Sequence, residues 1–131
     1  MTKLKSLLFL IGAVQIILGL LTLFAPSFLF GSMGLSIPAD DNHYMLAMLG
    51  GRFLAYGFGM FIIMRDPEGN IKWIDNMIFI QIVDLAAGVF YTLGDVVSLG
   101  DAAFPMFDAT LFIVLLLWLR PKPQITQPET A

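Results

Sequence analysis

The sequence has no cysteine and little charge. Asp, Glu, Lys and Arg make up 13% of its 131 residues, whereas a soluble domain carries about 25%. Hydrophobic residues make up 58%, so too few polar side chains remain to cover a water-facing surface. The absence of cysteine excludes disulfides, thiol catalysis and thiolate metal sites. We therefore expect an integral membrane protein without a metal or another cofactor.

Long polar segments are also missing, which excludes a large soluble catalytic domain. With a single histidine and no cysteine, the chain offers no set of nucleophile, base and orienting group. We predict that it is not an enzyme; an enzymatic role would need a lipid substrate and carboxylate acid–base chemistry. The formal net charge of −3 gives no support for a nucleic-acid partner.

Four apolar runs are long enough to cross a bilayer, which takes about 20 residues in a helix. They cover about residues 4–30, 44–64, 73–99 and 102–119. The first run is longer than the apolar region of a secretory signal and lacks its cleavage site, so we expect a membrane helix. The predicted fold is an all-α, four-helix transmembrane bundle over residues 1–120. We expect residues 121–131, rich in proline and threonine, to be disordered.

Basic residues predict the orientation, because they are retained on the cytoplasmic side in short loops. The loops between the first and second spans and between the third and fourth spans contain no Lys or Arg. Six basic residues lie before the first span, between the second and third spans, and after the fourth: Lys3, Lys5, Arg65, Lys72, Arg120 and Lys122. Both termini should therefore lie in the cytoplasm, and the protein should be a multi-pass protein of the inner (plasma) membrane.

Three ionisable residues lie well inside the predicted spans, namely Arg52, Asp84 and Asp108, and Asp95 lies near the outer end of the third span. At about 1.5 Å per residue, Arg52 lies about 12 Å, Asp108 about 9 Å and Asp84 about 20 Å below the outer ends of their helices. Such groups are costly in lipid and usually find a partner inside the bundle. The matching depths favour an ion pair or triad.

Small and polar residues form stripes on three of the helices. The third span carries Gln81, Asp84, Gly88, Tyr91 and Asp95 on one face, and the first carries Gly12, Gln15, Gly19 and Thr22. The second repeats Ala47, Gly51, Ala55 and Gly59 every four residues, with Arg52 and Tyr56 beside them. Small residues at this spacing let another helix approach closely, so they predict a helix-packing groove.

Two interpretations of the polar cluster remain open. In one, Arg52 pairs with Asp84 or Asp108 and only fixes the helix register. In the other, the cluster lines a small polar cavity that binds an ion, a polar molecule or a lipid head group, with Arg52 as the anion-binding group. One arginine cannot neutralise two buried carboxylates, and this excess of acid favours the second interpretation. The cluster comprises Arg52, Asp84, Asp108, Tyr56, Gln81, Gln15 and Asp95.

The segment LGGRFLAYG at residues 49–57, together with Ala25 and Pro26 at the end of a long first helix, resembles small bacterial four-helix inner-membrane proteins of a family of unknown function. The resemblance covers the first half of the chain. It implies a compact inner-membrane bundle and no established activity.

These observations predict a non-catalytic accessory or ligand-binding bundle. Its expected partners are the lipid bilayer, a lipid or small polar ligand, and either further copies of the chain or a larger membrane complex that uses the groove. The alternative is a small transporter or channel in which Arg52, Asp84 and Asp108 line the pathway.

Overall fold

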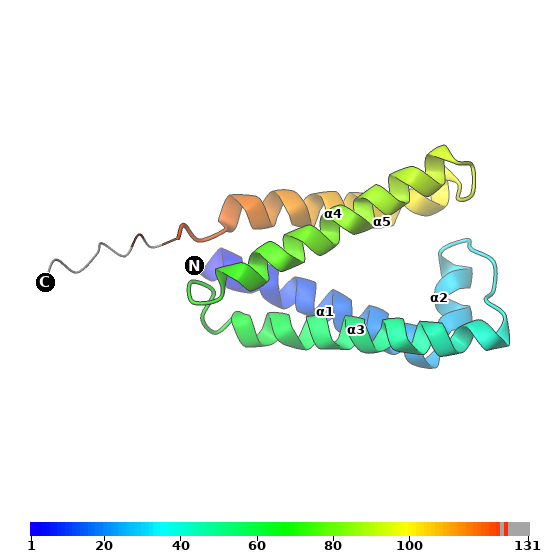
Figure 1. Cartoon of the computed structure of the whole chain (residues 1–131), viewed down its shortest axis with the longest axis horizontal. Coiled ribbons are helices and arrows are strands. Elements are labelled where there is room, and N and C mark those ends of the chain that lie inside the picture. The colour runs from blue at the N-terminus through cyan, green and yellow to red at the C-terminus, as the bar shows by residue number, and fades with distance from the viewer. Residues whose placement is uncertain (124, 126–131) are drawn as a thin grey trace, which may run out of the picture.

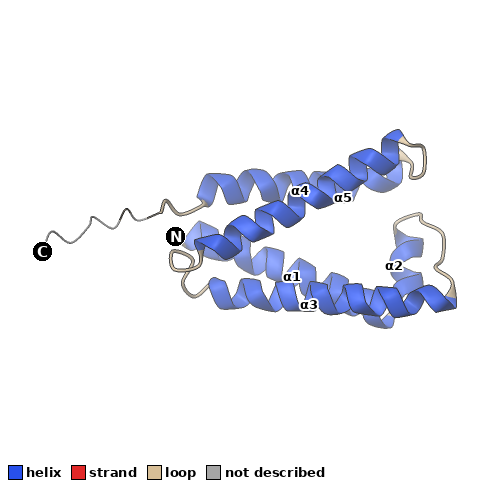
Figure 2. Ribbon diagram, viewed as in Figure 1, coloured by secondary structure: helices blue, strands red, loops and turns tan. Residues whose placement is uncertain are grey.

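The computed structural model describes residues 1–123 and 125, and within them the chain is all-α, with no strand (Figure 2). The long helices are α1 (Thr2–Phe24), α3 (His43–Ile63), α4 (Ile71–Leu93) and α5 (Leu99–Leu119). All four are long and apolar enough to cross a membrane. The all-α class and the four apolar helices are thus confirmed. Of the tail expected to be disordered, residues 121–123 and 125 are not helical, and residues 124 and 126–131 lie outside the described part.

The first predicted span, residues 4–30, is divided between two helices. α1 ends at Phe24, and the short helix α2 (Pro26–Ser32) begins at the next proline. Ala25 has φ −142° and ψ 52°, outside the helical region, because the ring of a following proline disfavours helical backbone. Figure 1 shows α2 turned across the direction of α1. Residues 26–30 therefore do not continue the first span.

The turn between α4 and α5 comes earlier in the chain than the predicted spans, residues 73–99 and 102–119, imply. α4 ends at Leu93, and Asp95 adopts a positive φ of 55°. Ser98 then caps α5, because its Oγ accepts a hydrogen bond from the backbone N–H of Asp101 at 3.1 Å. Such a cap satisfies a free N–H at the start of a helix and fixes where the helix begins. The turn places Asp95 beyond the end of α4, off the stripe to which it was expected to belong.

α1 packs on α3 through pairs of glycines. A Cβ at Gly57 would lie 2.8 Å from the backbone oxygen of Gly12, and one at Gly50 would lie 3.0 Å from that of Gly19. Only glycine allows the two backbones to come this close. The close approach therefore uses Gly50 and Gly57 and not the predicted groove.

The helices form two hairpins, α1 with α3 and α4 with α5, which Figure 1 shows close together at the end that holds the N-terminus and farther apart at the other. The buried apolar core belongs to the first of these ends. Its members are Leu4, Leu7, Leu8, Ile11, Met60, Ile63, Ile74, Met77, Ile78, Phe112 and Leu116. In α4 the buried residues reach only to Gln81, and no residue from 82 to 93 is buried.

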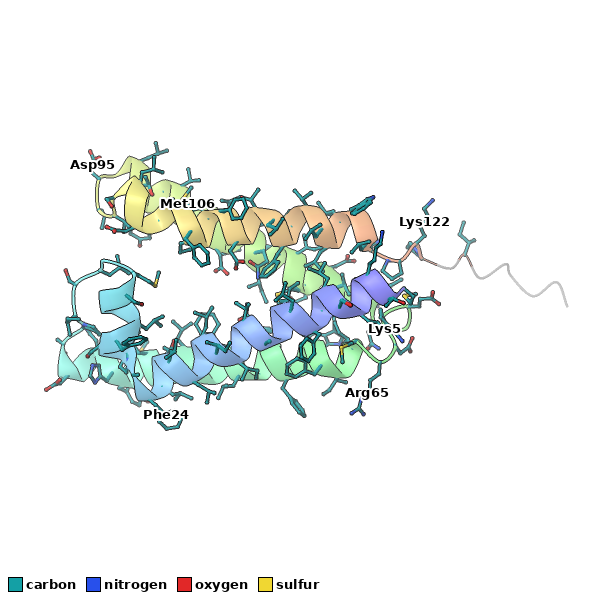
Figure 3. The ribbon with its side chains drawn as sticks, turned by 180° about the vertical axis from the view of Figure 1, so that it is seen from behind. Lys5, Phe24, Arg65, Asp95, Met106 and Lys122 are labelled. Carbon is teal, nitrogen blue, oxygen red and sulfur yellow. The ribbon has the colours of Figure 1, made fainter. Side chains whose placement is uncertain are left out.

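Charged residues divide between the two ends of the molecule. Lys5, Arg65 and Lys122 lie at one end and Asp95 at the other (Figure 3). At the basic end, the ammonium group of Lys3 lies 6.0 Å from the ring of Trp118. The start of α1, the loop between α3 and α4 and the chain after α5 therefore lie at one end of the molecule.

Candidate functional site

Arg52 lies near the middle of α3 with an exposed side chain. Its Nη1 donates a hydrogen bond to the backbone oxygen of Met48, one turn back along the helix, at 3.2 Å. Within residues 1–123 and 125 it forms no ion pair. The expected pairing with Asp84 or Asp108 is therefore not formed, and the hairpins diverge away from the end that holds the N-terminus (Figure 1).

Asp84 is exposed on α4 and Asp108 is half-buried on α5. Neither forms an ion pair or a side-chain hydrogen bond with another residue in the described part of the chain. Asp84 lies in residues 82–93 of α4, none of which is buried, whereas Asp108 precedes the buried Ala109 of α5. Two carboxyl groups at mid-helix thus have no side-chain partner within the described part of the chain.

A double-mutant cycle checks this arrangement. Combining Arg52→Ala with Asp84→Ala should give additive losses, with a coupling free energy below about 0.5 kcal/mol, because the two groups do not touch. The measurement is unfolding in detergent micelles. A coupling free energy of several times that size would show that the two side chains form an ion pair.

The two glutamines are the most buried members of the predicted cluster. Gln15 is 4% exposed and Gln81 is 3% exposed. The Nε2 of Gln81 donates to the sulfur of Met77 at 3.5 Å, whereas the Oε1 of Gln15 is buried without a partner. Neither glutamine lines the pocket between α3 and α4 that Arg52 lines. The cluster is therefore divided between the packed core and the exposed faces of the hairpins.

Arg52 and Tyr56 meet two members of the predicted small-residue groove in an open groove between α3 and α4, hereafter the α3–α4 groove. Its volume is about 610 Å³. The lining from α3 includes Arg52, Ala55, Tyr56 and Gly59, and that from α4 includes Trp73 and Asn76. A Cβ at Gly59 or at Gly51 would meet no atom within 4 Å. This face of α3 is therefore free to receive another molecule.

An ion pair that the sequence did not predict lies at the basic end of the molecule. Arg120 donates to both carboxylate oxygens of Asp75, at 2.5 and 2.7 Å. This hydrogen bond raises the pKa of the Arg120 guanidinium above its usual range, so the group stays charged. The two residues are far apart in sequence, and only their place at the same end of neighbouring helices could have suggested the pair.

We expect the Asp75 and Arg120 pair to matter little for stability. Both side chains reach solvent, with exposures of 44% and 29%, and exposed pairs are screened by salt. Asp75→Asn should therefore produce a small loss of thermal stability that disappears at high ionic strength. A loss that persists in high salt would contradict this expectation.

Comparisons with known proteins give no further evidence for function: no family model, no curated protein and no solved structure matches the chain. The resemblance to small bacterial inner-membrane proteins therefore stays a prediction. Within the described residues, no group of three His, Asp or Glu side chains could hold a metal ion.

Proposed function

We propose that this chain is a non-catalytic, multi-pass protein of the bacterial inner membrane that serves as an accessory bundle. Its role is to bind a second membrane component at the outer halves of its two hairpins. Both termini face the cytoplasm in this proposal, and the turn around Asp95 faces outward.

The observation that carries the proposal is the lack of buried residues in the second half of α4. From residue 82 onward α4 has no buried residue, although this part of the helix is strongly apolar. Asp84 lies on this part of α4 and Asp108 lies half-buried on α5, both without a partner among the described residues. An ionised carboxylate at the centre of a membrane helix costs at least about 2.5 kcal/mol. A bound component that donates hydrogen bonds to the carboxylates would offset this cost.

The chemistry of the surface indicates what can bind there. Exposed large apolar residues on the outer half of α4 include Val83, Val89, Phe90 and Leu93. A membrane helix carrying a polar donor matches this combination of apolar surface and carboxylate. Further copies of this chain and a subunit of a larger complex both have that chemistry.

Native mass spectrometry of the protein, gently extracted from its own membrane, tests the proposal. We expect a stoichiometric second component, and we expect Asp84→Leu to reduce its retention at least tenfold. Asp95→Leu is the matched control, because Asp95 lies in the turn beyond α4. A bare monomer whose mass spectrum is the same in all three proteins would contradict the proposal.

The alternative is a small transporter or channel in which Arg52, Asp84 and Asp108 line the path. It is favoured by the exposure of Arg52 and Asp84 at mid-helix without ion pairs among the described residues. Flux of protons or small ions into liposomes, abolished by Asp84→Asn with the fold intact, would support this function over the accessory role.

A further inference from the structure

Arg52 and Asp84 carry opposite charges at nearly the same level of two helices that are consecutive in the chain. Arg52 lies eleven residues before the end of α3 at Ile63, and Asp84 lies thirteen residues after the start of α4 at Ile71. The loop that joins these ends lies at the end that holds the N-terminus (Figure 1). Helix rise places the two Cα atoms about 17 Å and about 20 Å from it. The difference is less than one helical turn, and the long arginine side chain can cover it.

Both charges also lie on one side of the molecule. Arg52 of α3 and Trp73 of α4 line the α3–α4 groove. Asp84 follows Trp73 by eleven residues, about three full turns, so the two share a face of α4. The side chains of Arg52 and Asp84 are exposed. This surface, hereafter the α3–α4 face, includes Arg52, Ala55 and Gly59 of α3 and Trp73, Asn76 and Asp84 of α4.

Neither charge has an ionic partner in the described part of the chain. The hydrogen bond from Arg52 to the Met48 oxygen uses one of the five N–H donors of the guanidinium. A bound helix that carries only a donor would satisfy Asp84 and leave Arg52 unpaired in lipid, where such a charge is costly. A partner that satisfies both must present an anion and a cation at matching levels. A second copy of this chain presents that combination.

Two-fold symmetry brings the opposite charges together. A rotation by 180° about an axis parallel to the helices, set over the α3–α4 face, places α3 of each copy opposite α4 of the other. The rotation leaves every residue at its own level and gives both copies the same direction across the membrane. Ala55 and Gly59 are small, and a Cβ at Gly59 would meet no atom within 4 Å, so a second helix can approach here.

We propose that two copies of this chain form a two-fold dimer through their α3–α4 faces, in which Arg52 of each copy pairs with Asp84 of the other. The inference rests on the proposed function and names its second membrane component as another copy of the chain. The pairing needs two copies. Coupling between Arg52 and Asp84 is therefore expected in the dimer, and not in the monomer that an excess of detergent micelles isolates.

Two charge reversals distinguish pairing between copies from pairing within one chain. Arg52→Asp leaves two negative charges on the α3–α4 face, and Asp84→Arg leaves two positive charges. A dimer of either variant alone would set like charges against each other. A mixture of the two variants would set each negative face against a positive one and restore both ion pairs.

The experiment is native mass spectrometry of the full chain, with the two variants co-expressed on tags of different mass and gently extracted. The wild type should give a dimer, and each reversal alone should weaken dimerisation at least about tenfold, since every dimer loses two charged pairs. The mixture should give a heterodimer with an affinity within about threefold of the wild type. The double variant, with both reversals in one chain, should also dimerise.

Neutral variants provide a second test that does not depend on inserting a reversed charge into the membrane. Arg52→Gln and Asp84→Asn should each weaken dimerisation at least about tenfold. The matched controls are Arg65→Gln in the exposed loop between α3 and α4 and Asp95→Asn in the turn after α4. Both controls should stay within about twofold of the wild type.

Four results would overturn the dimer. Full dimerisation of the neutral variants would place the contact elsewhere. Rescue by the double variant without rescue by the mixture would place the ion pair within one chain. A wild-type chain bound to a component of another mass, which Asp84→Leu releases, would reject the second copy and keep the proposed function. A bare wild-type monomer would reject both.

Discussion

Replacing Gly57 with leucine should destabilise the fold by about 3 kcal/mol, the upper end of the usual cost of overpacking. A Cβ at this position would lie 2.8 Å from the backbone oxygen of Gly12 and 2.8 Å from the side chain of Ile16. The backbone oxygen cannot rotate away, so α1 and α3 would have to separate. The measurement is the free energy of unfolding in micelles or bicelles.

Gly51→Leu provides the control for this prediction. It adds the same side chain to the same helix, where no atom lies within 4 Å, so the stability should stay within about 0.5 kcal/mol of the wild type. Similar losses in the two variants would mean that helix propensity, and not the crossing of α1 with α3, sets the cost.

Asp84→Leu should make insertion of α4 into the membrane more favourable by about 3 kcal/mol, since aspartate at a helix centre is costly and leucine is favourable. The stability of the isolated chain should not fall, because the Asp84 carboxylate is exposed and forms no ion pair among the described residues. Retention of a bound component should nevertheless be lost. This combination separates a residue kept for binding from one kept for folding.

An insertion assay with a glycosylation reporter measures the first effect, and unfolding in detergent measures the second. Asp95→Leu is the control, and it should change insertion far less because Asp95 lies beyond the end of α4. A loss of more than about 1 kcal/mol in the unfolding of Asp84→Leu would show that the carboxylate is bonded inside the chain.

The number of long helices and the positions where they end depend on residues close together in the sequence, so the sequence indicates both. Apolar length predicts the four long helices, and Pro26 and the glycine-containing turn at 94–98 explain where two of them end. The sequence also indicates which residues share a helix face. It does not show which neighbour that face meets.

The glycines of α3 illustrate this limit. A repeat of four residues pointed to Gly51 and Gly59, yet α1 packs on Gly50 and Gly57, which are seven residues apart. The matching interval between Gly12 and Gly19 was the signal for this crossing. The rule for close helix approach describes the four-residue repeat, whereas the contacts formed depend on where α1 lies.

The expected ion pair shows a second limit. Depth along the membrane normal can be estimated from helix rise, and it places Arg52 and Asp84 within reach of each other in one dimension. The lateral separation depends on how the hairpins pack. Because the buried core lies toward one end, the opposite halves diverge and the charges do not meet.

The central claim is that the two hairpins pack at the end that holds the N-terminus and stay apart at the opposite end. The absence of cysteine allows spin labels to be placed at chosen positions without background. One doubly labelled protein carries Met48→Cys with Phe90→Cys in the outer halves of α3 and α4. The other carries Ile62→Cys with Trp73→Cys, which both line the α3–α4 groove. Pulsed electron paramagnetic resonance in lipid nanodiscs measures the distance between the two labels in each protein. The distance between positions 48 and 90 should be longer than that between positions 62 and 73.

A distance between positions 48 and 90 that is equal to or shorter than the other would indicate a closed four-helix bundle and contradict the account.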